Sequence, residues 1–508
     1  MYAKPEECEN IMTKYPDKPY MLCEYSHAMG NSCGGNEKYM ALFDKYPSFL
    51  GAFVWDFVDQ AIVTETADGK KYFGYGGDFG DFPNDGVFCG NGLLFADRTE
   101  TPKMAEIKRL YQNVEISAAD AGKGKIRIKN GFMFSNLSEY NLHFQQISGN
   151  KVLHSGDLTV DIAPDGEKEV KLDIKKNIDG EWYLNVLVEQ RDSVKWAKAG
   201  HVVAKKQFVI NEYKLGKKNI AKAEMTAVTE YGTVYVYGGD MEVRFSKRHH
   251  RLYSVKKGGT EYLNAPVVPQ FWRALTDNDK GNKMNVRCGT WKDAGKDASF
   301  DIYEVKETGK TVIVKSRFKA FTFPKETTGE VIYTVGSEGI HIDYSVDIPE
   351  GVPEVPNIAL LFESAESFHS LEYLGKGPFE NYIDRNKGSD IGLYKTDIKS
   401  LYVPYLNPQE HGNRTEVRYA KLIGTKKSLL IEADKSMEIN ICRWSADELE
   451  RATHGYELSE NDKPYITVSA RQMGIGGYDS WGARTLPEYE NKAGEKYSVG
   501  FSVIPLDK

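Results

Sequence analysis

The sequence has few cysteines for its length, and it lacks the patterns that would mark a zinc-binding, redox or membrane protein. Six cysteines are scattered over 508 residues. None forms a C-x-x-C pair, so a zinc or disulfide-exchange motif is not expected. Because they are so scattered, we expect reduced thiols rather than a disulfide framework. No apolar run approaches the length of a membrane span, and no signal peptide, internal repeat or low-complexity linker is apparent.

An excess of positive charge is also missing. The chain carries 66 Lys and Arg against 73 Asp and Glu, a net charge of −7, with a pI near 5.9. Proteins that bind nucleic acid or anionic membranes through electrostatics carry the opposite sign, so we expect neither partner. We expect a cytoplasmic protein. A periplasmic one is the alternative if the natural N-terminus lies further upstream.

The composition is ordinary for a globular protein, and the length suggests about three domains. Aromatic residues make up 12% of the chain, with 31 Tyr among them. Aromatic faces suit sugar binding, but the β-propensity of these residues explains the total better. Composition therefore favours extensive β-structure and does not identify a ligand.

Glu24 is the most informative residue. The short apolar run of residues 20–23 ends in this carboxylate, and a polar loop containing glycine follows. A buried parallel strand that delivers a catalytic acid to the mouth of a (β/α)₈ barrel has this pattern. In such a barrel, several hundred residues should precede a nucleophile that lies on a late strand. We therefore expect the C-terminal part of an enzyme, starting inside its catalytic domain.

Residues 1–113 alternate between helix and strand patterns. Two apolar sets have the i, i+3, i+4, i+7 spacing of one helix face: Cys8, Ile11, Met12 and Tyr15, then Tyr39, Leu42, Phe43 and Tyr46. Residues 20–23 and 51–60 look like buried strands. The order helix, strand, helix, strand predicts the last units of a TIM barrel, with about six strands absent.

The rest of the chain has β patterns. Residues 126–130, 141–144 and 182–188 alternate with period two within 114–215, which predicts an immunoglobulin-like β-sandwich. Residues 216–508 continue as all-β, with glycine turn signals at 257–259 and 335–339. This stretch is longer than an ordinary sandwich and predicts a large double-sheet domain.

Six segments, in order along the whole chain, resemble the large five-domain bacterial β-galactosidases of glycoside hydrolase family 2. They are CEYSHAMGNS (23–32), GAFVWDFVDQ (51–60), YGGDFGDFPND with FCGNGL (75–85, 88–93), RALTDND (273–279), LGKGPFENY (374–382) and MGIGGYDSW (473–481). The resemblance implies a TIM-barrel part, an immunoglobulin-like sandwich and a galactose mutarotase-like supersandwich of the β-galactosidase small-chain type. It also implies cleavage of terminal β-D-galactose residues from lactose-like β-galactosides, with retention.

The resemblance assigns roles to individual residues. Glu24 matches the nucleophile. Four residues match positions that contact substrate: His27, Trp55, Asn91 and Trp481. From the residues alone, His27 and the two tryptophans could equally belong to the core. Indole faces do pack on sugar C–H groups, which favours a substrate role.

Metal sites are implied by the resemblance only. Asn91, together with the backbone carbonyl of Phe88, matches an active-site sodium site, and Asn84 matches a position near the catalytic magnesium. Backbone carbonyls in the turn after the second helix match a peripheral sodium loop: Phe43, Tyr46, Pro47 and Phe49. The other magnesium ligands of the family lie upstream of the matched region.

A retaining glycosidase needs a second carboxylate about 5–5.5 Å from the first, as general acid/base. In the family this Glu also lies upstream, so we expect it to be missing from this chain. Asp56 and Asp59 could be proposed instead, but hydrogen bonds that anchor the barrel end explain them better. The Gly-rich loop with Asp78, Asp81 and Asp85 could bind a metal. Bonds from these side chains to the loop backbone are the simpler interpretation.

Two alternatives stay open. The chain could be a subunit of a split β-galactosidase whose partner supplies the acid/base and the rest of the barrel, or a non-catalytic sandwich module that binds sugar or protein. The intact Glu24 segment argues against the second. The expected partners are the β-galactoside and the missing N-terminal part or partner subunit, and a complete enzyme should be a homo-oligomer.

Overall fold

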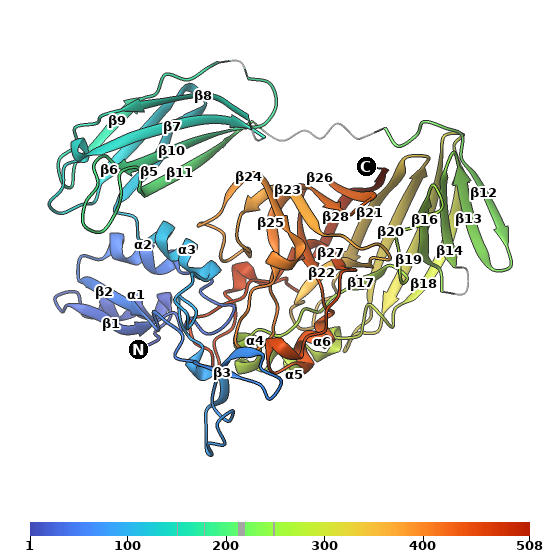
Figure 1. The fold of residues 1–508 in the computed structure, drawn as a ribbon, viewed down its shortest axis with the longest axis horizontal. Coiled ribbons are helices and arrows are strands. Elements are labelled where there is room, and N and C mark those ends of the chain that lie inside the picture. The colour runs from blue at the N-terminus through green and yellow to red at the C-terminus, as the bar shows by residue number, and fades with distance from the viewer. Residues whose placement is uncertain (150, 177, 212–218, 247–248, 508) are drawn as a thin grey trace. The chain divides into compact units, whose positions relative to one another are not determined.

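A computed structural model describes residues 1–149, 151–176, 178–211, 219–246 and 249–507 (Figure 1). The chain forms two compact units. The first contains Met1–Met104, Lys217–Asn386 and Tyr394–Lys508, and the second contains Ala105–Gly216 and Lys387–Leu393. The division predicted at residues 113 and 215 stays a prediction.

The N-terminal part of the first unit is a small α/β layer. Strands β1 (Tyr20–Tyr25) and β2 (Phe49–Val54) pair in parallel, and helices α1 (Pro5–Lys14) and α2 (Glu37–Lys45) lie in the same hydrophobic cluster. Helix α1 begins at a proline, whose fixed φ and missing N–H suit a first helical position. The order helix, strand, helix, strand agrees with the prediction.

The extent of these elements differs from the prediction in two ways. Cys8 and Met12 of α1 are buried, but Ile11 and Tyr15 are exposed, so α1 packs through only half of its predicted face. The second strand ends at Val54 rather than at residue 60. Beyond it, Asp56 and Asp59 donate their backbone N–H groups to loop carbonyls at 91 and 94, which replaces strand pairing.

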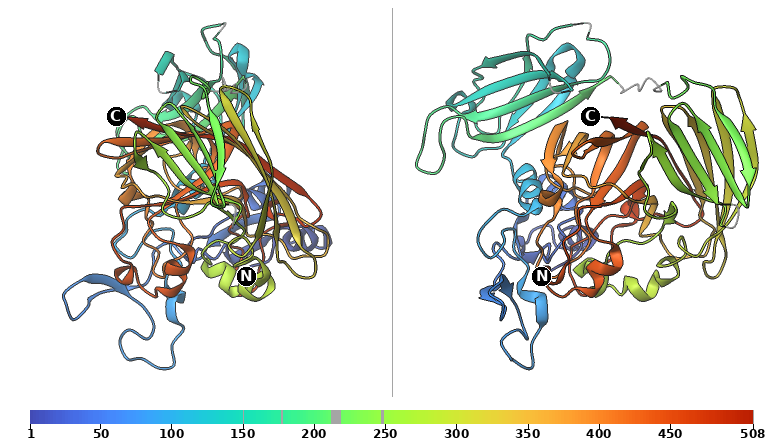
Figure 2. Two further views of the ribbon diagram at one scale, coloured as in Figure 1. Left: turned by 90° about the vertical axis from the view of Figure 1, so that its right-hand side faces the viewer. Right: turned by 45° about the vertical axis from the view of Figure 1, so that its right-hand side comes forward.

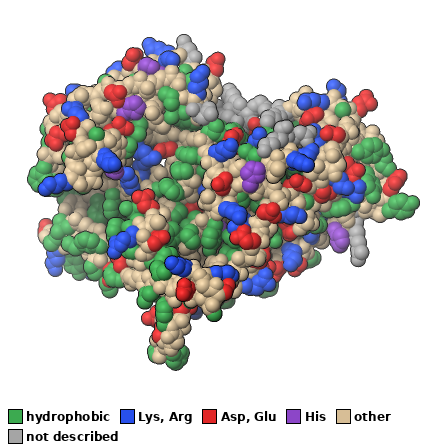
Figure 3. Space-filling model, in the orientation of Figure 1, with side chains coloured by type: hydrophobic (Ala, Val, Ile, Leu, Met, Phe, Trp, Pro, Cys, Tyr) green, Lys and Arg blue, Asp and Glu red, His purple; other side chains and the backbone are tan. Residues whose placement is uncertain are grey.

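The parallel pair is covered less completely than expected. Met21 is 51% exposed, Leu50 63% and Phe53 62%. Parallel sheets in proteins normally have both faces covered. Figure 3 shows hydrophobic side chains gathered on the surface over this α/β layer.

The rest of the first unit is two antiparallel sheets over one large core. One sheet has five strands: β12 (Thr226–Glu230), β13 (Thr233–Gly238), β14 (Met241–Ser246), β15 (Arg251–Lys257) and β16 (Thr260–Glu261). The other has twelve: β17 (Val268–Gln270), β18 (Ser299–Glu307), β19 (Thr311–Ala320), β20 (Thr327–Gly336), β21 (Gly339–Asp347), β22 (Asn357–Glu363), β23 (Ser370–Gly377), β24 (Asp390–Asp397), β25 (Arg414–Ile423), β26 (Lys427–Cys442), β27 (Tyr465–Gln472) and β28 (Lys496–Asp507). The smaller sheet lies beside β18–β20 in the views of Figures 1 and 2.

Alternating side chains build the core between these sheets. Val234, Val236 and Phe245 of the small sheet share one cluster with residues of the large sheet, and the Phe245 and Tyr333 rings lie 5.0 Å apart. The predicted turns are where expected. Gly258 and Gly259 join β15 to β16 with φ of 54° and 78°, the left-handed region that favours glycine.

Short elements complete the first unit: the hairpin β3 (Ile62–Glu65) and β4 (Lys71–Gly74), and the helices α4 (Asp277–Gly281), α5 (Met284–Arg287) and α6 (Ala446–Arg451). Helix α3 (Pro102–Leu110) begins in the first unit and continues into the second. Helix α6 begins with a capping box, in which Ser445 and Glu448 satisfy each other's backbone N–H groups. Among the described residues, no helix is both long enough and apolar enough to span a membrane.

The second unit is a seven-stranded sandwich. One sheet contains β5 (Val114–Asp120), β6 (Lys125–Asn130) and β9 (Glu167–Lys171); the other contains β7 (Tyr140–Ser148), β8 (Lys151–Leu158), β10 (Trp182–Gln190) and β11 (Val202–Ile210). Inward residues of both sheets, such as Ile126, Phe144 and Leu184, form its own core. The three strand patterns predicted here are confirmed by β6, β7 and β10.

Candidate active site

Glu24 lies at the carboxyl end of β1. Because β1 and β2 are parallel, the residues that follow both strands meet at one edge, where sites form in barrel enzymes. The Glu24 side chain is half-buried. Its backbone carbonyl accepts a hydrogen bond from Tyr2 N at 2.9 Å, so the strand end is held from outside the sheet.

His27, three residues further on, is buried and held in one orientation. Its Nδ1 lies 2.8 Å from Ser480 Oγ, and Ser480 Oγ donates to Asn278 Oδ1 at 2.8 Å. Since the serine proton goes to Asn278, Nδ1 must be the donor to Ser480, which leaves Nε2 as an acceptor. Burial, reinforced by Lys103, lowers the pKa of His27 to about 4. The imidazole is therefore neutral at pH 7.

Aromatic rings surround His27. The Trp481 ring centroid lies 5.3 Å from that of His27, and the Phe88 centroid lies 5.9 Å away. Trp481 is 50% exposed, so about half of its surface stays available to a ligand. Asp479 Oδ1 accepts hydrogen bonds from the backbone N–H groups of residues 481–483, which fixes the turn that carries the tryptophan.

Tyr2 is a site residue that the sequence did not reveal. Its ring lies 4.7 Å from Trp481 and 5.9 Å from His27. Burial, with a hydrogen bond to the Glu24 carboxylate, raises the pKa of Tyr2 above its ordinary range. No motif surrounds Tyr2 in the sequence, so only the fold could identify it.

Trp55 and Asn91 lie on the neighbouring loops. Trp55 follows β2, its carbonyl accepts from Ala28 N at 2.7 Å, and its side chain is 39% exposed. Asn91 Nδ2 donates to the Phe88 carbonyl at 2.8 Å. The structure thus brings Glu24, His27, Phe88 and Trp481 into one neighbourhood and ties the loops of Trp55 and Asn91 to it.

Lys103 holds the loop that follows β1 in place. It is 1% exposed, and its Nζ donates to the carbonyls of Ala28 at 2.5 Å and Gly30 at 2.9 Å. Burial lowers the pKa of Lys103. A lysine in an amphipathic stretch gives no sign of such burial, which is why the sequence did not predict it.

The remaining residues implied by the resemblance lie on two loops. The Asn84 side chain makes two hydrogen bonds within its own loop. Its Nδ2 donates to Asp81 O at 2.9 Å, and its Oδ1 accepts from Gly86 N at 3.0 Å. Phe43, Tyr46, Pro47 and Phe49 lie at the α2–β2 turn. There the Phe43 and Phe49 rings stack at 4.2 Å, and Phe49 N donates to Tyr46 O at 2.9 Å.

The acidic residues near the barrel end have structural partners. Asp56 accepts from Gln60 Nε2 at 2.8 Å, and buried Asp59 accepts from Gly92 N at 2.6 Å. Asp78 accepts from Tyr75 N at 2.8 Å, and Gly77 N donates to Asp81 at 2.9 Å. These bonds agree with anchoring of the barrel end and stiffening of the loop.

Family models match three parts of the chain. "Beta galactosidase small chain" matches residues 237–503, "Glycosyl hydrolases family 2, TIM barrel domain" matches 1–116, and "Beta-galactosidase, domain 4" matches 126–211. Together with the parallel pair β1–β2 and the large β-sheets, these matches confirm the predicted fold class.

Curated relatives match almost the whole chain. The proteins named "Beta-galactosidase" from Priestia megaterium, Halalkalibacterium halodurans and Streptococcus thermophilus are 39%, 36% and 32% identical, over 100%, 99% and 100% of this chain. The matches cover 49%, 50% and 51% of those proteins, so the chain spans about half the length of the curated relatives it matches. A galactose mutarotase-like protein from Lactobacillus casei aligns with 56% of this chain at 13% identity and a TM-score of 0.29, too low to carry an argument.

Proposed function

The chain belongs to the β-galactosidases of glycoside hydrolase family 2, and from this membership we propose that Glu24 is the nucleophile of a retaining β-galactosidase. The proposed substrates are lactose-like β-galactosides with a terminal, non-reducing β-D-galactose. The observation that carries the proposal is the position of Glu24: a half-buried carboxylate at the carboxyl end of a parallel strand, close to His27 and the exposed face of Trp481.

Each neighbour of Glu24 has a role in this proposal. The Glu24 carboxylate attacks the anomeric carbon and forms a glycosyl ester, which water then hydrolyses. Neutral His27 accepts a hydrogen bond from a sugar hydroxyl at Nε2, and Asn91 binds another hydroxyl. Trp55 and Trp481 each offer a partly exposed indole face to sugar C–H groups.

The general acid/base comes from outside these 508 residues. It would protonate the leaving oxygen and then activate water, a contribution of about 10²–10⁴-fold. Met21, Leu50 and Phe53 on β1 and β2 are more than half exposed, as expected of strands that pair with further barrel strands. Those strands belong either to the same polypeptide or to a partner subunit of a split enzyme.

Sodium and magnesium are part of the proposal. The Phe88 carbonyl and the Asn91 side-chain oxygen are the oxygen ligands that hard cations take, and a hydrogen bond between the two residues holds them together. A bound sodium ion would supply a fixed positive charge for a substrate hydroxyl. Asn84 uses both ends of its amide inside its loop, which suits a place beside the magnesium better than a ligand role.

Covalent trapping tests the nucleophile. The chain, supplied with the missing part of the enzyme, is inactivated with a 2-deoxy-2-fluoro-β-galactoside, digested and analysed by mass spectrometry. The expected result is one fluorogalactosyl group on Glu24. A label on another carboxylate would remove Glu24 from this role.

A further inference from the structure

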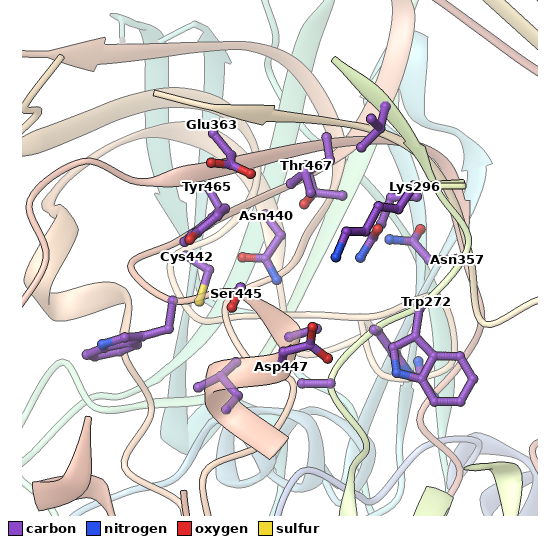
Figure 4. Close-up of a pocket in the computed structure, with 18 of the residues that line it drawn as sticks. Trp272, Lys296, Asn357, Glu363, Asn440, Cys442, Ser445, Asp447, Tyr465 and Thr467 are labelled. Carbon is purple, nitrogen blue, oxygen red and sulfur yellow. The ribbon is translucent and has the colours of Figure 1, made fainter. Parts of the chain in front are cut away.

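A second cavity lies on the twelve-stranded sheet of the first unit. Its volume is about 450 Å³, and none of the residues around Glu24 described above lines it. Its floor is one face of the adjacent strands β22, β27 and β26, and its walls are α6, residues 292–296 and Trp272 (Figure 4). Its volume lies within the range of about 300–1,000 Å³ that ligand pockets have.

The floor is polar because alternate residues of each strand face opposite sides. On the buried side, residues of all three strands belong to the hydrophobic core: Ile358, Leu360, Phe362, Ile439, Ile441, Ile466 and Val468. On the cavity side, Thr467 pairs across the strands with Leu361 and Asn440, and Tyr465 pairs with Glu363 and Cys442. An apolar floor would have suited packing against another domain, whereas this one presents hydrogen-bonding groups.

Several polar groups of the floor and the wall have no partner among the residues that the structure describes. In the part of the chain that the structure describes, no hydrogen bond or ion pair involves the Glu363 carboxylate, the Thr467 hydroxyl or the Lys296 ammonium. Asn357, which is 3% exposed, has an unpaired buried Oδ1. Figure 4 shows Glu363, Thr467 and Lys296 around the same hollow.

Two tryptophans and Lys292 of the wall, in contrast, are held in place by hydrogen bonds. Trp272 Nε1 and Lys292 Nζ both donate to Glu450, each at 2.7 Å. Trp444 Nε1 donates to Ser459 O at 2.7 Å. The indole N–H groups are thus already used by the protein, so the two tryptophans offer a ligand mainly apolar contact. A preformed cavity with hydrogen-bonded tryptophans and with unpaired polar groups on its floor and wall is organised for a ligand.

The chemistry of the free groups identifies the ligand class. A carboxylate accepts hydrogen bonds, an ammonium donates them, and a threonine hydroxyl does both. Because Glu363 and Lys296 carry opposite charges, a strongly charged ligand would meet repulsion from one of them. Neutral molecules with many hydroxyls and apolar C–H faces satisfy all of these groups and also pack against indole rings.

We infer that this cavity is a second saccharide site, which binds one or two neutral sugar units through Glu363, Thr467 and Lys296. It goes beyond the proposed hydrolysis at Glu24 and needs no chemical step. Its occupancy therefore does not depend on whether Glu24 is a nucleophile.

Binding to the 508-residue chain tests the inference. D-galactose, D-glucose and lactose are titrated by calorimetry into the parent chain, into a Glu24→Gln/Trp481→Ala chain, and into a Glu363→Gln/Thr467→Val chain. A control chain carries Glu350→Gln and Thr328→Val at exposed positions elsewhere. The expected result is a binding event for at least one sugar that persists in the Glu24/Trp481 chain and the control. In the cavity variant its Kd should rise about 10- to 100-fold, as expected when hydrogen bonds to a charged and a hydroxyl group are lost.

A second readout locates the ligand without changing the cavity. The seven tryptophans are replaced with 5-fluorotryptophan and assigned by single Trp→Phe variants. The ¹⁹F signals of Trp272 and Trp444 should shift with the same Kd. The inference is overturned if the parent chain binds none of the three sugars, if the cavity variant binds like the parent, or if only the Trp481 and Trp55 signals move.

Discussion

His27 Nδ1 lies 2.8 Å from Ser480 Oγ, a hydrogen bond between residues 453 positions apart. It joins the loop after β1 to the C-terminal β-domain and fixes which imidazole nitrogen points into the site. The sugar-binding face proposed around Glu24 is thus shaped by both ends of the chain.

Ser480→Ala should lower kcat/KM of the completed enzyme about tenfold, because His27 loses the acceptor that fixes its tautomer. The variant should also lose about 1–3 kcal/mol of stability, because His27 Nδ1 and Asn278 Oδ1 lose their buried partner. Steady-state kinetics on a nitrophenyl β-galactoside measures the effect, and Ser498→Ala, at an exposed position of β28, is the control. Unchanged kinetics in Ser480→Ala would mean that His27 needs no such support.

Glu24→Gln should abolish turnover in the completed enzyme while the protein stays folded, since the nearly isosteric amide cannot form a glycosyl ester. The 508-residue chain alone should also lack appreciable activity, because we propose that the acid/base and the other barrel strands lie outside it. Both are assayed on the same substrate, with circular dichroism as the folding check. Turnover by the isolated chain at the rate of the completed enzyme would contradict the second expectation.

Leu50→Asp should prevent completion of the barrel without destabilising the isolated chain by more than about 0.5 kcal/mol, because Leu50 is 63% exposed. Mixing the variant with the N-terminal part of a relative and measuring recovered activity tests this. Phe323→Asp, at a position that is 80% exposed on the β-domain, should complement normally. If both variants recover the same activity, the added barrel strands do not pack against Leu50.

Asp279→Asn should cost about 3–5 kcal/mol of stability. Arg273 and Asp279 are both about 1% exposed in their side chains, with Nη2 and Oδ1 3.0 Å apart, and loss of one partner leaves a buried charge unpaired. The exposed pair of Arg317 and Asp301 is the control, since Asp301→Asn should cost about 0–1 kcal/mol. Urea unfolding monitored by tryptophan fluorescence compares them, and equal midpoints would refute the prediction.

Glu410→Gln should change how stability depends on pH. Burial raises the pKa of Glu410 to about 7, so the folded state holds a proton that the unfolded chain releases near its ordinary pKa of 4.5. Its contribution to stability is therefore full below about pH 4.5 and is lost as the pH rises through 7. Relative to the parent, the variant should gain up to about 3 kcal/mol between pH 4.5 and 8.

Unfolding free energies measured at several pH values check this prediction, with Glu350→Gln at an exposed position as the control. Parallel pH profiles for the parent and Glu410→Gln would show that Glu410 is ionised in both states.

Much of the fold was predictable because local patterns decide it. Period-two alternation located β6, β7 and β10, and glycine pairs located the turn after β15. The apolar run of residues 51–60 was misleading, since apolar residues continue past Val54 while their backbone groups bond to a loop. Similarly, helical spacing predicted one face for α1 but could not show that Ile11 and Tyr15 would remain exposed.

The sequence by itself determined the family and the position of Glu24, because a strand that ends in a carboxylate and the motifs around it are local features. Only the tertiary structure placed Tyr2, Lys103 and Ser480 beside His27. Their contacts join segments up to 453 residues apart, and no spacing along the chain records such an approach. The cavity on β22, β27 and β26 was likewise beyond the sequence, because its floor exists only where three separate strands are in register.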